Sequence, residues 1–340
     1  MAESKKEDRI QFIKEIEKER KSRLLIYITG DRRSLETRIA GDIIPIIYEQ
    51  LILNIGSVDN IDLYIYTAGG DSLAGWAIVN IIREFCKKFN VIIPFKCNSC
   101  GTLISLGANE ILMAKGGQLS PVDPSLASPY NPPAPGQTVQ LLPVSVEDVL
   151  GYLKLAKEEA GIKGDEGLGQ VMKILSEKVN PMALGAVYRS KQQIRLLAER
   201  LLSNHEKDGK KIADIVEKLT EKLPSHQYLI SRKEAKELFS LKIVEPEDKV
   251  EKLIYDLYKE YEKWFEIRMP YNPETVLGTN PVSQGLFDRG VVKSLRGDSL
   301  KTYVYRTEKE LKRVQGTQPG VPFPIVGVQE RIIREGWVEI

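Results

Sequence analysis

Residues 23–126 alternate regularly between short apolar strands and helices, and this alternation limits the possible folds more strictly than any other feature of the chain. The runs "RLLIYITG" at 23–30 and "DNIDLYIYTAGG" at 59–70 are rich in β-branched and aromatic residues and end in glycine. Between them, "DIIPIIYEQLILNIG" is apolar on nearly every helical turn, and the cycle repeats with a helix over 72–89 and a strand over 90–98. Such alternation predicts parallel strands covered by helices, so we expect an α/β core.

The remaining sequence predicts a three-part organisation: an N-terminal charged helix over 1–22, a main domain over 23–245, and a C-terminal helix and extension over 246–340. Ile10, Ile13 and Ile16 form one thin apolar stripe on the first helix, which favours a solvated surface helix, with packing on a neighbouring subunit as the alternative.

Capping signals mark helices in the second half of the chain. Asn180 is a candidate N-cap, because Pro181 after it suits the first helical position. Ser231 and Glu234 have the spacing of a capping box. In the C-terminal extension, "KTYVYRT" predicts a strand that is followed by a short charged helix.

Composition excludes several classes of function. The 340 residues include 49 basic and 47 acidic side chains, and a net charge of +2 gives no field that would attract nucleic acid or a membrane surface. Three cysteines are too few for a disulfide framework and fit a reducing compartment. The charged N-terminus is unlike a signal peptide, and no apolar run approaches the roughly 20 residues of a membrane span. We therefore expect a cytoplasmic protein.

Two polar turns end strands of the predicted core and carry the candidate chemistry. They lie in "YTAGGDSLAG" at 66–75 and "NSCGT" at 98–102, and in a parallel sheet both emerge at the carboxyl edge, where ligands bind. Ser99 ends a strand and precedes a small apolar helix, an arrangement that exposes a nucleophile in several hydrolases. The alternative for Ser99 is a helix N-cap without catalysis, and the residues alone weigh the two evenly.

The pair Cys97-x-x-Cys100 indicates metal or redox chemistry as a further alternative. Zinc generally needs four ligands, and the chain has no second cysteine pair and only two histidines, far away in the sequence. A redox pair is a minor alternative. The glycine turn lacks the G-x-G-x-x-G spacing of nucleotide sites, so we expect no cofactor and no metal.

These motifs, in this order, resemble the Clp-fold serine peptidases, and most closely the serine dehydrogenase proteinase (SDH) family, which is related to signal peptide peptidase A and the Clp protease subunits. The family's Pro-Gly-Gly, Ser-Ala-Gly-Thr and Gly-Pro-Val-Asp-Pro segments correspond to Ala68-Gly69-Gly70, Ser99-Cys100-Gly101-Thr102 and Ser120-Pro121-Val122-Asp123-Pro124. The resemblance covers roughly residues 23–245. It implies a Clp/crotonase-like fold of repeated ββα units with a helical second half and a small C-terminal extension.

The resemblance assigns roles to the two turns. Ser99 takes the place of the nucleophile, and the backbone amides of Gly70 and Cys100 would form the oxyanion hole. Gly69 belongs to the same turn, and the extended segment that starts at Asp71 would pair with the backbone of a substrate.

The general base is left open between two hypotheses. The histidine position of the Clp protease subunits falls on Asp123, whereas His226 precedes a segment that resembles the place of their triad aspartate. If the two have exchanged positions, His226 is the base and Asp123 orients it. The second hypothesis is a serine-lysine dyad, as in the signal peptide peptidase relatives. Its candidate bases are Lys154, Lys157, Lys163 and Lys191.

Together these observations predict a serine endopeptidase that cleaves peptides or unfolded protein through an acyl-enzyme at Ser99. The resemblance implies a homo-oligomer, and with no nucleotide motif any unfolding ATPase or adaptor would be a separate partner. The alternatives are a crotonase-like acyl-CoA enzyme, which uses the same two amides, and a catalytically silent scaffold.

Overall fold

The computed structural model describes residues 2–122, 125–126, 144–223, 225, 227–297, 299–316 and 325–340. The chain divides into two compact units. One, here called the sheet unit, comprises Met1–Leu119 and Ser231–Ile340, and the other, the helical unit, comprises Ser120–Ile230. This division differs from the boundaries predicted from the sequence, because residues 1–22 and 246–340 both lie in the sheet unit.

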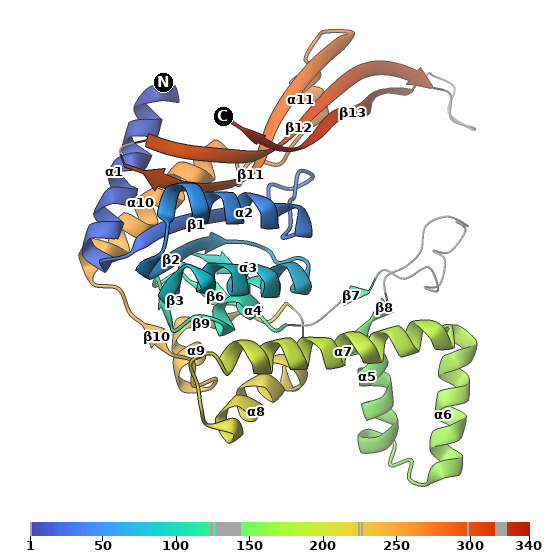
Figure 1. Cartoon of the computed structure of the whole chain (residues 1–340). Helices are drawn as coiled ribbons and strands as arrows, with labels where there is room; N and C mark the ends of the chain where they lie inside the picture. Colours follow the sequence, from blue (N-terminus) through green and yellow to red (C-terminus); the bar gives the residue numbers. More distant parts are fainter. Residues whose placement is uncertain are drawn as a thin grey trace. The chain divides into compact units, whose positions relative to one another are not determined.

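The sheet unit is built on one eight-stranded sheet with the strand order β10-β5-β3-β2-β1-β11-β12-β13 (Figure 1). Its strands are β1 (Arg23–Thr29), β2 (Val58–Tyr66), β3 (Cys86–Ile93), β5 (Glu110–Met113), β10 (Ile243–Val244), β11 (Val282–Arg296), β12 (Ser299–Gly316) and β13 (Ile325–Glu339). Strands β10, β5, β3, β2 and β1 are parallel, as the alternating pattern predicts, and Leu25 of β1 lies opposite Leu63 of β2. The α/β fold class is confirmed.

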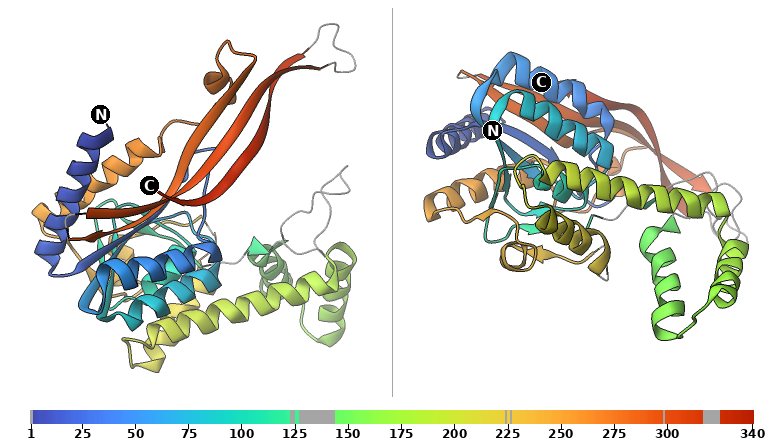
Figure 2. Two further views of the ribbon diagram at one scale, coloured as in Figure 1. Left: turned by 45° about the horizontal axis from the view of Figure 1, so that its top comes forward. Right: turned by 60° about the horizontal axis from the view of Figure 1, so that its bottom comes forward.

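Helices cover both faces of this sheet (Figures 1 and 2). The helices of the sheet unit are α1 (Ala2–Arg20), the 3-10 helix η1 (Gly41–Ile43), α2 (Ile44–Gln50), the π-helix η2 (Leu51–Ile55), α3 (Ser72–Glu84), α4 (Cys100–Leu106), α9 (Arg232–Glu237), α10 (Asp248–Trp264) and α11 (Pro273–Leu277). Leu24, Ile26 and Ile28 of β1 join one core cluster with α1 and α10. Since side chains alternate along a strand, the neighbouring Leu25 and Tyr27 face the other layer, and both are buried.

The N-terminal helix is part of this core, which corrects the expectation of a solvated surface helix. Ile13 and Ile16 are fully buried in the cluster that α10 contributes to, with Ile10 packed against it. The stripe is thin because α10 covers only one side of α1, while the rest of the helix carries charges. Burying two isoleucines contributes about 3–6 kcal/mol, so α1 is a structural element of the sheet unit.

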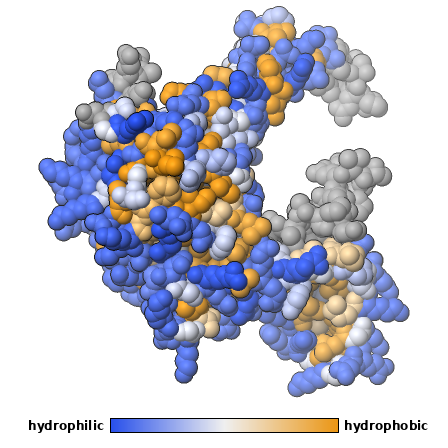
Figure 3. All heavy atoms as spheres, in the orientation of Figure 1, coloured by the Kyte–Doolittle hydropathy of each residue, from blue (hydrophilic) through white to orange (hydrophobic). Residues whose placement is uncertain are grey.

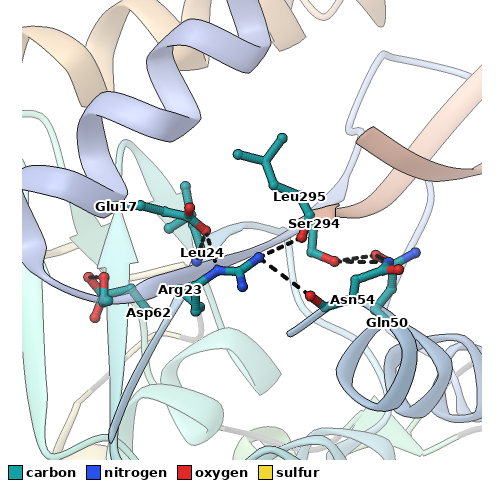
Figure 4. A network of polar contacts seen from close by, with 9 residues as sticks. Glu17, Arg23, Leu24, Gln50, Asn54, Asp62, Ser294 and Leu295 are labelled. Carbon is teal, nitrogen blue, oxygen red and sulfur yellow. Dashed lines mark hydrogen bonds and ion pairs between the residues drawn. The ribbon is translucent and has the colours of Figure 1, made fainter. Parts of the chain in front are cut away.

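A polar network joins α1 and the C-terminal strand β11 to the first residues of β1 (Figure 4). Glu17 accepts hydrogen bonds from the Arg23 Nε and from the Leu24 amide, at 3.1 and 2.8 Å. The Arg23 guanidinium also donates to the carbonyl of Leu295 in β11. Beside it, Ser294 donates to Gln50 at 2.6 Å. Hydrogen bonds therefore join segments that lie 244 and 272 residues apart in the chain.

The C-terminal extension is a three-stranded antiparallel ribbon that continues the sheet beyond β1 (Figure 2). Strand β11 pairs with β1, β12 with β11, and β13 with β12. The short charged helix predicted after "KTYVYRT" is absent from the described residues there, because β12 runs unbroken through that segment.

The helical unit contains α5 (Val146–Lys154), the π-helix η3 (Leu155–Glu159), α6 (Asp165–Lys178), α7 (Pro181–Leu202), α8 (Gly209–Glu217) and the π-helix η4 (Lys218–Lys222), with β7 (Ser125–Leu126) paired to β8 (Val144–Ser145). The short β9 (Ile230–Ser231) lies at the boundary between the units. Asn180 caps α7 and accepts from the Met182 amide at 2.8 Å, and Ser231 with Glu234 forms a capping box at α9, so both predicted caps are confirmed. No helix among the described residues has the length and apolarity needed to cross a bilayer.

Candidate active site

The two predicted turns lie side by side beyond the carboxyl end of β2, although the short strand before Ser99 belongs to a second, three-stranded sheet. Thr67, which follows β2, forms a parallel bridge with Cys97 in β4 (Lys96–Cys97). The Thr67 amide donates to the Lys96 carbonyl at 2.9 Å, and the Asn98 amide donates to the Thr67 carbonyl at 3.1 Å. These two bonds bring the glycine turn after Thr67 next to Ser99.

Ser99 occupies a strained backbone position between β4 and α4. Its φ of 50° and ψ of −109° lie where residues other than glycine rarely occur. Holding such a conformation costs about 1–3 kcal/mol, and strained residues of this kind gather at active sites. Although Ser99 is the N-cap of α4, its side chain makes no capping hydrogen bond, and the residue is half-buried. The Ser99 hydroxyl therefore does not cap α4, which was the alternative role for this residue.

The glycine turn lies against the Ser99 side chain. A Cβ atom added to Gly69 would lie 2.8 Å from the Ser99 Cβ, closer than real Cβ atoms approach their neighbours, and 3.3 Å from the Ser99 Oγ. Gly69 and Gly70 have φ of 108° and 153°, values that L side chains rarely adopt. Glycine is thus required at position 69 both by the backbone conformation and by the neighbouring hydroxyl.

Ile39 and Thr67 hold this turn in place. The Ile39 amide donates to the Gly69 carbonyl at 3.0 Å, and the Asp71 amide donates to the Ile39 carbonyl at 2.8 Å. The Thr67 hydroxyl accepts from the Gly69 amide at 2.9 Å. In a parallel bridge of this kind the amide and carbonyl of Gly70 point away from Ile39. Within the described residues, no acceptor takes the Gly70 or the Cys100 amide.

Asp71 has a local structural role that conflicts with the substrate pairing predicted for its backbone, because its amide donates to the Ile39 carbonyl and α3 begins at Ser72. Its side chain accepts a hydrogen bond from the Leu73 amide at 2.9 Å and so caps α3. Its carbonyl accepts from the Cys100 thiol at 3.0 Å. The N-termini of α3 and α4 are thereby joined directly behind the two turns.

Both cysteines of the Cys97-x-x-Cys100 pair are buried and free. Burial raises the pKa of the Cys97 thiol to about 12. Burial and the negative charge of Asp71 also raise the pKa of the Cys100 thiol. Both thiols are therefore protonated at neutral pH, the form that neither attacks nor ligates a metal. No group of three or more metal-ligating side chains occurs in the part of the chain that the structure describes.

Comparison with known proteins agrees with this geometry. Residues 1–140 match the family model of ClpP-like SDH-type serine proteinases. The resemblance predicted from the sequence is confirmed over that stretch, which holds Ser99 and the glycine turn, and it supports a peptidase.

Two curated relatives are uncharacterized proteins of Methanocaldococcus jannaschii. MJ1495 is 35% identical over 125 residues, which cover 35% of this chain and 42% of the relative. MJ0137 is 30% identical over 180 residues, which cover 52% of this chain and 51% of the relative. The chain thus spans about half the length, or less, of the curated relatives that it matches.

Similar solved structures include a mutant of the 1510-N membrane-bound stomatin-specific protease and ClpP1 from Listeria monocytogenes. The first is 14% identical with a TM-score of 0.39 and covers 70% of this chain and 85% of that one. The second is 17% identical with a TM-score of 0.36 and covers 70% of this chain and 97% of that one.

The predicted base and its partner, His226 and Asp123, lie outside the described residues. The lysine candidates belong to the helical unit. Lys191 forms an ion pair with Glu221 at 3.2 Å, and Lys154 donates to the Glu221 carbonyl at 3.5 Å. The other two candidates, Lys157 and Lys163, are exposed. The identity of the base stays a prediction.

Sequence reasoning missed Ile39 and Thr67, which position the glycine turn. Nothing in "RIAGD" around Ile39 sets it apart, since its role comes from its backbone and depends on a contact 31 residues away in the chain. Thr67 could have been found, because threonine two residues before a glycine can accept from the backbone of the following turn.

Burial predicts slow alkylation of both turn cysteines. In the folded protein at about pH 8, we expect iodoacetamide to leave Cys97 and Cys100 unmodified over the time in which the unfolded chain reacts completely. Cys86 is half-buried, and burial raises the pKa of its thiol to about 11, so it should react slowly but first. Peptide mapping by mass spectrometry measures the three rates. Rapid modification of Cys100 would contradict the assignment and favour a redox role.

Close packing of α3 on α4 predicts a steric effect at Gly75. A Cβ at this position would lie 2.4 Å from the Cys100 Sγ, so we expect Gly75→Ala to lower the free energy of unfolding by about 1–3 kcal/mol. Adding Cys100→Ala should recover much of this loss in a double-mutant cycle measured by chemical denaturation.

A matched control for this cycle is Gly169→Ala in α6, where an added Cβ meets nothing within 4 Å. This variant should gain up to about 1 kcal/mol from helix propensity. If Gly75→Ala behaves in the same way, α3 and α4 are not in the close contact described.

Proposed function

We propose that this chain is a serine peptidase that cleaves peptides or unfolded protein through an acyl-enzyme at Ser99. The observation that carries the proposal is the Ser99 side chain, which sits at a strained strand-to-helix turn, makes no capping bond, and lies against Gly69. The family match over residues 1–140 supports the same reaction class.

In the proposed reaction, the Ser99 Oγ attacks the carbonyl carbon of the scissile peptide bond and gives its proton to the general base. The Gly70 and Cys100 amides donate to the oxyanion of the tetrahedral intermediate. Because both amides are fixed by the turns described above, they stabilise this charge without reorganisation. The C–N bond then breaks, the amine leaves with the proton, and water hydrolyses the acyl-enzyme in a second step.

We propose His226 as the base and Asp123 as the residue that orients it, with a lysine among Lys154, Lys157, Lys163 and Lys191 as the alternative. The substrate would lie along the side of Gly70 that faces away from Ile39 and pair there with the Gly70 backbone.

We further propose that the chain acts as a homo-oligomer, with any unfolding ATPase or adaptor as a separate partner. Apolar surface gathers over α2, η2 and α3 (Figure 3), where Tyr48, Ile52, Leu53 and Leu73 are each about half exposed, between 47% and 51%. Exposed apolar patches of this kind favour contacts between subunits.

Labelling with a fluorophosphonate tests the proposed chemistry. We expect one adduct per chain, mapped by tandem mass spectrometry to the peptide that contains Ser99, and no adduct in Ser99→Ala or in heat-unfolded protein. Absence of labelling in the folded protein would overturn the proposal and favour a catalytically silent scaffold.

A further inference from the structure

One loop connects the proposed oxyanion turn to the C-terminal strands. Residues 30–40 follow β1 and end next to η1, and they include Ile39, whose backbone pairs with the glycine turn. The fit there is tight, since a Cβ on Gly70 would lie 2.1 Å from the Ile39 carbonyl oxygen. A displacement of Ile39 would therefore displace Gly70, and with it one of the two proposed oxyanion donors.

Packing alone does not fix this loop. Its first half borders a cavity of about 550 Å³, to which Gly30, Arg32 and Leu35 contribute from the loop and Trp264, Phe287 and Arg289 from later segments. A loop beside a cavity lacks part of the close contacts that hold a core segment in place. Its position therefore depends more strongly on hydrogen bonds.

Arg289 supplies side-chain hydrogen bonds to the loop shortly before Ile39, next to the bond from the Thr37 amide to the Gly30 carbonyl at 2.8 Å. Its Nε donates to the Leu35 carbonyl at 3.1 Å, and its second terminal nitrogen donates to the Glu36 carbonyl. Its own backbone carbonyl accepts from the Gly30 amide at 2.7 Å. Arg289 of β11 thus binds the loop at its start, at Gly30, and again near its middle, at Leu35 and Glu36.

The position of Arg289 in the sheet explains how its side chain reaches the loop. Asp288 pairs with Arg306 of β12, and Gly290 pairs with the next residue, Tyr305, so Arg289 is the extra residue of a β-bulge. A bulge changes the direction of a side chain that would otherwise point to one face of the sheet in the regular alternation of the strand.

The guanidinium is also anchored on its far side. Its remaining nitrogen donates to the Thr307 hydroxyl of β12 at 2.9 Å and to the Glu335 carboxylate of β13 at 3.2 Å. The Arg289 side chain is 15% exposed, so these charge-assisted bonds are only partly screened by solvent. All three C-terminal strands therefore act on the loop through this one side chain.

We infer that Arg289 is a positioning residue for the oxyanion hole, acting through the 30–40 loop and Ile39 on Gly70. The inference rests on the proposed function. It gives the C-terminal ribbon a defined task, which is to hold the Gly70 amide at the distance from Ser99 that the transition state requires, because small misplacements of catalytic groups slow reactions strongly.

The test compares Arg289→Met with Arg306→Met in the full chain. Arg289→Met keeps the apolar stem and removes every donor to the loop. Arg306 is a matched control, because it forms a bidentate pair with Asp288 in the same strand pair, so that its Nε and one terminal nitrogen donate to this carboxylate and not to the loop. For each variant, the rate constant of fluorophosphonate labelling and the kcat and KM for p-nitrophenyl acetate are measured well below the midpoint of thermal unfolding.

We expect Arg289→Met to lower both the labelling rate and kcat by roughly 10-fold to 100-fold with KM changed less than about twofold, while Arg306→Met stays near wild type. Arg289→Lys should be slowed less, because an ammonium group can reach one carbonyl but cannot bridge two. Should Arg289→Met fail to fold, Arg289→Lys tests the same point.

Labelling of Arg289→Met or Arg289→Lys at the wild-type rate would overturn the inference, as would equal slowing by Arg306→Met. Failure of the wild-type protein to label at Ser99 would instead overturn the proposed function, so the two failures are distinguishable.

Discussion

Ser99→Ala is expected to lower ester or peptide hydrolysis by at least about 10³-fold while the protein stays folded. The hydroxyl oxygen is the proposed attacking atom, and no other described nucleophile shares its place, since the neighbouring Cys100 thiol is buried and protonated. Hydrolysis of p-nitrophenyl acetate and of an unfolded protein substrate measures the effect, with circular dichroism to confirm the fold.

Ser105→Ala serves as the matched control, because Ser105 lies in α4, the helix that follows Ser99, and donates to the Gly101 carbonyl at 2.9 Å. It should retain nearly all activity. Substantial activity in Ser99→Ala would contradict the peptidase, and if that activity were toward acyl-CoA thioesters it would favour the crotonase-like alternative.

Gly70→Ala is expected to lower the same activity by roughly 100-fold to 1000-fold, the effect of losing one oxyanion donor. The added Cβ would meet the Ile39 backbone at 2.1 to 2.8 Å, and φ of 153° is unfavourable for alanine, so the turn must move. We expect stability to fall as well, and activity is therefore compared at a temperature where both proteins are folded.

Gly56→Ala is the control that separates the backbone strain of an alanine at positive φ from the displacement of the Gly70 amide. Gly56 also has a positive φ, of 71°, but an added Cβ there meets nothing within 4 Å. This variant should lose only about 1 kcal/mol of stability and keep its activity. Equal activity in the two variants would mean that the Gly70 amide takes no part in the reaction.

The α/β core and the pairing of the two turns were predictable from the sequence, because both follow from local signals. The β-rich run at 59–70 ends in Gly69 and Gly70, and Ser99 follows a second such run and precedes a small apolar helix. Parallel strands bring such ends to one edge of a sheet. The caps at Asn180 and Ser231 were predictable for the same reason, since a cap acts on its own first turn.

The parts that could not be predicted depend on long-range contacts. The segment after "KTYVYRT" has the charged composition of a helix, yet it forms part of β12 because β11 and β13 pair with it on both sides. The thin stripe of Ile13 and Ile16 gave no sign that α10, more than 230 residues later, would cover it. Likewise, the bulge that aims Arg289 at the 30–40 loop has no signature in the sequence.

The most direct test of the central claim is an acid-quenched reaction with p-nitrophenyl acetate, in which p-nitrophenol release and the mass of the protein are followed together. The account predicts a rapid release of about one equivalent per chain, with the acetyl group on the peptide that contains Ser99, and neither signal in Ser99→Ala. Equal release by the wild-type protein and Ser99→Ala, with Ser99 unmodified throughout, would contradict it.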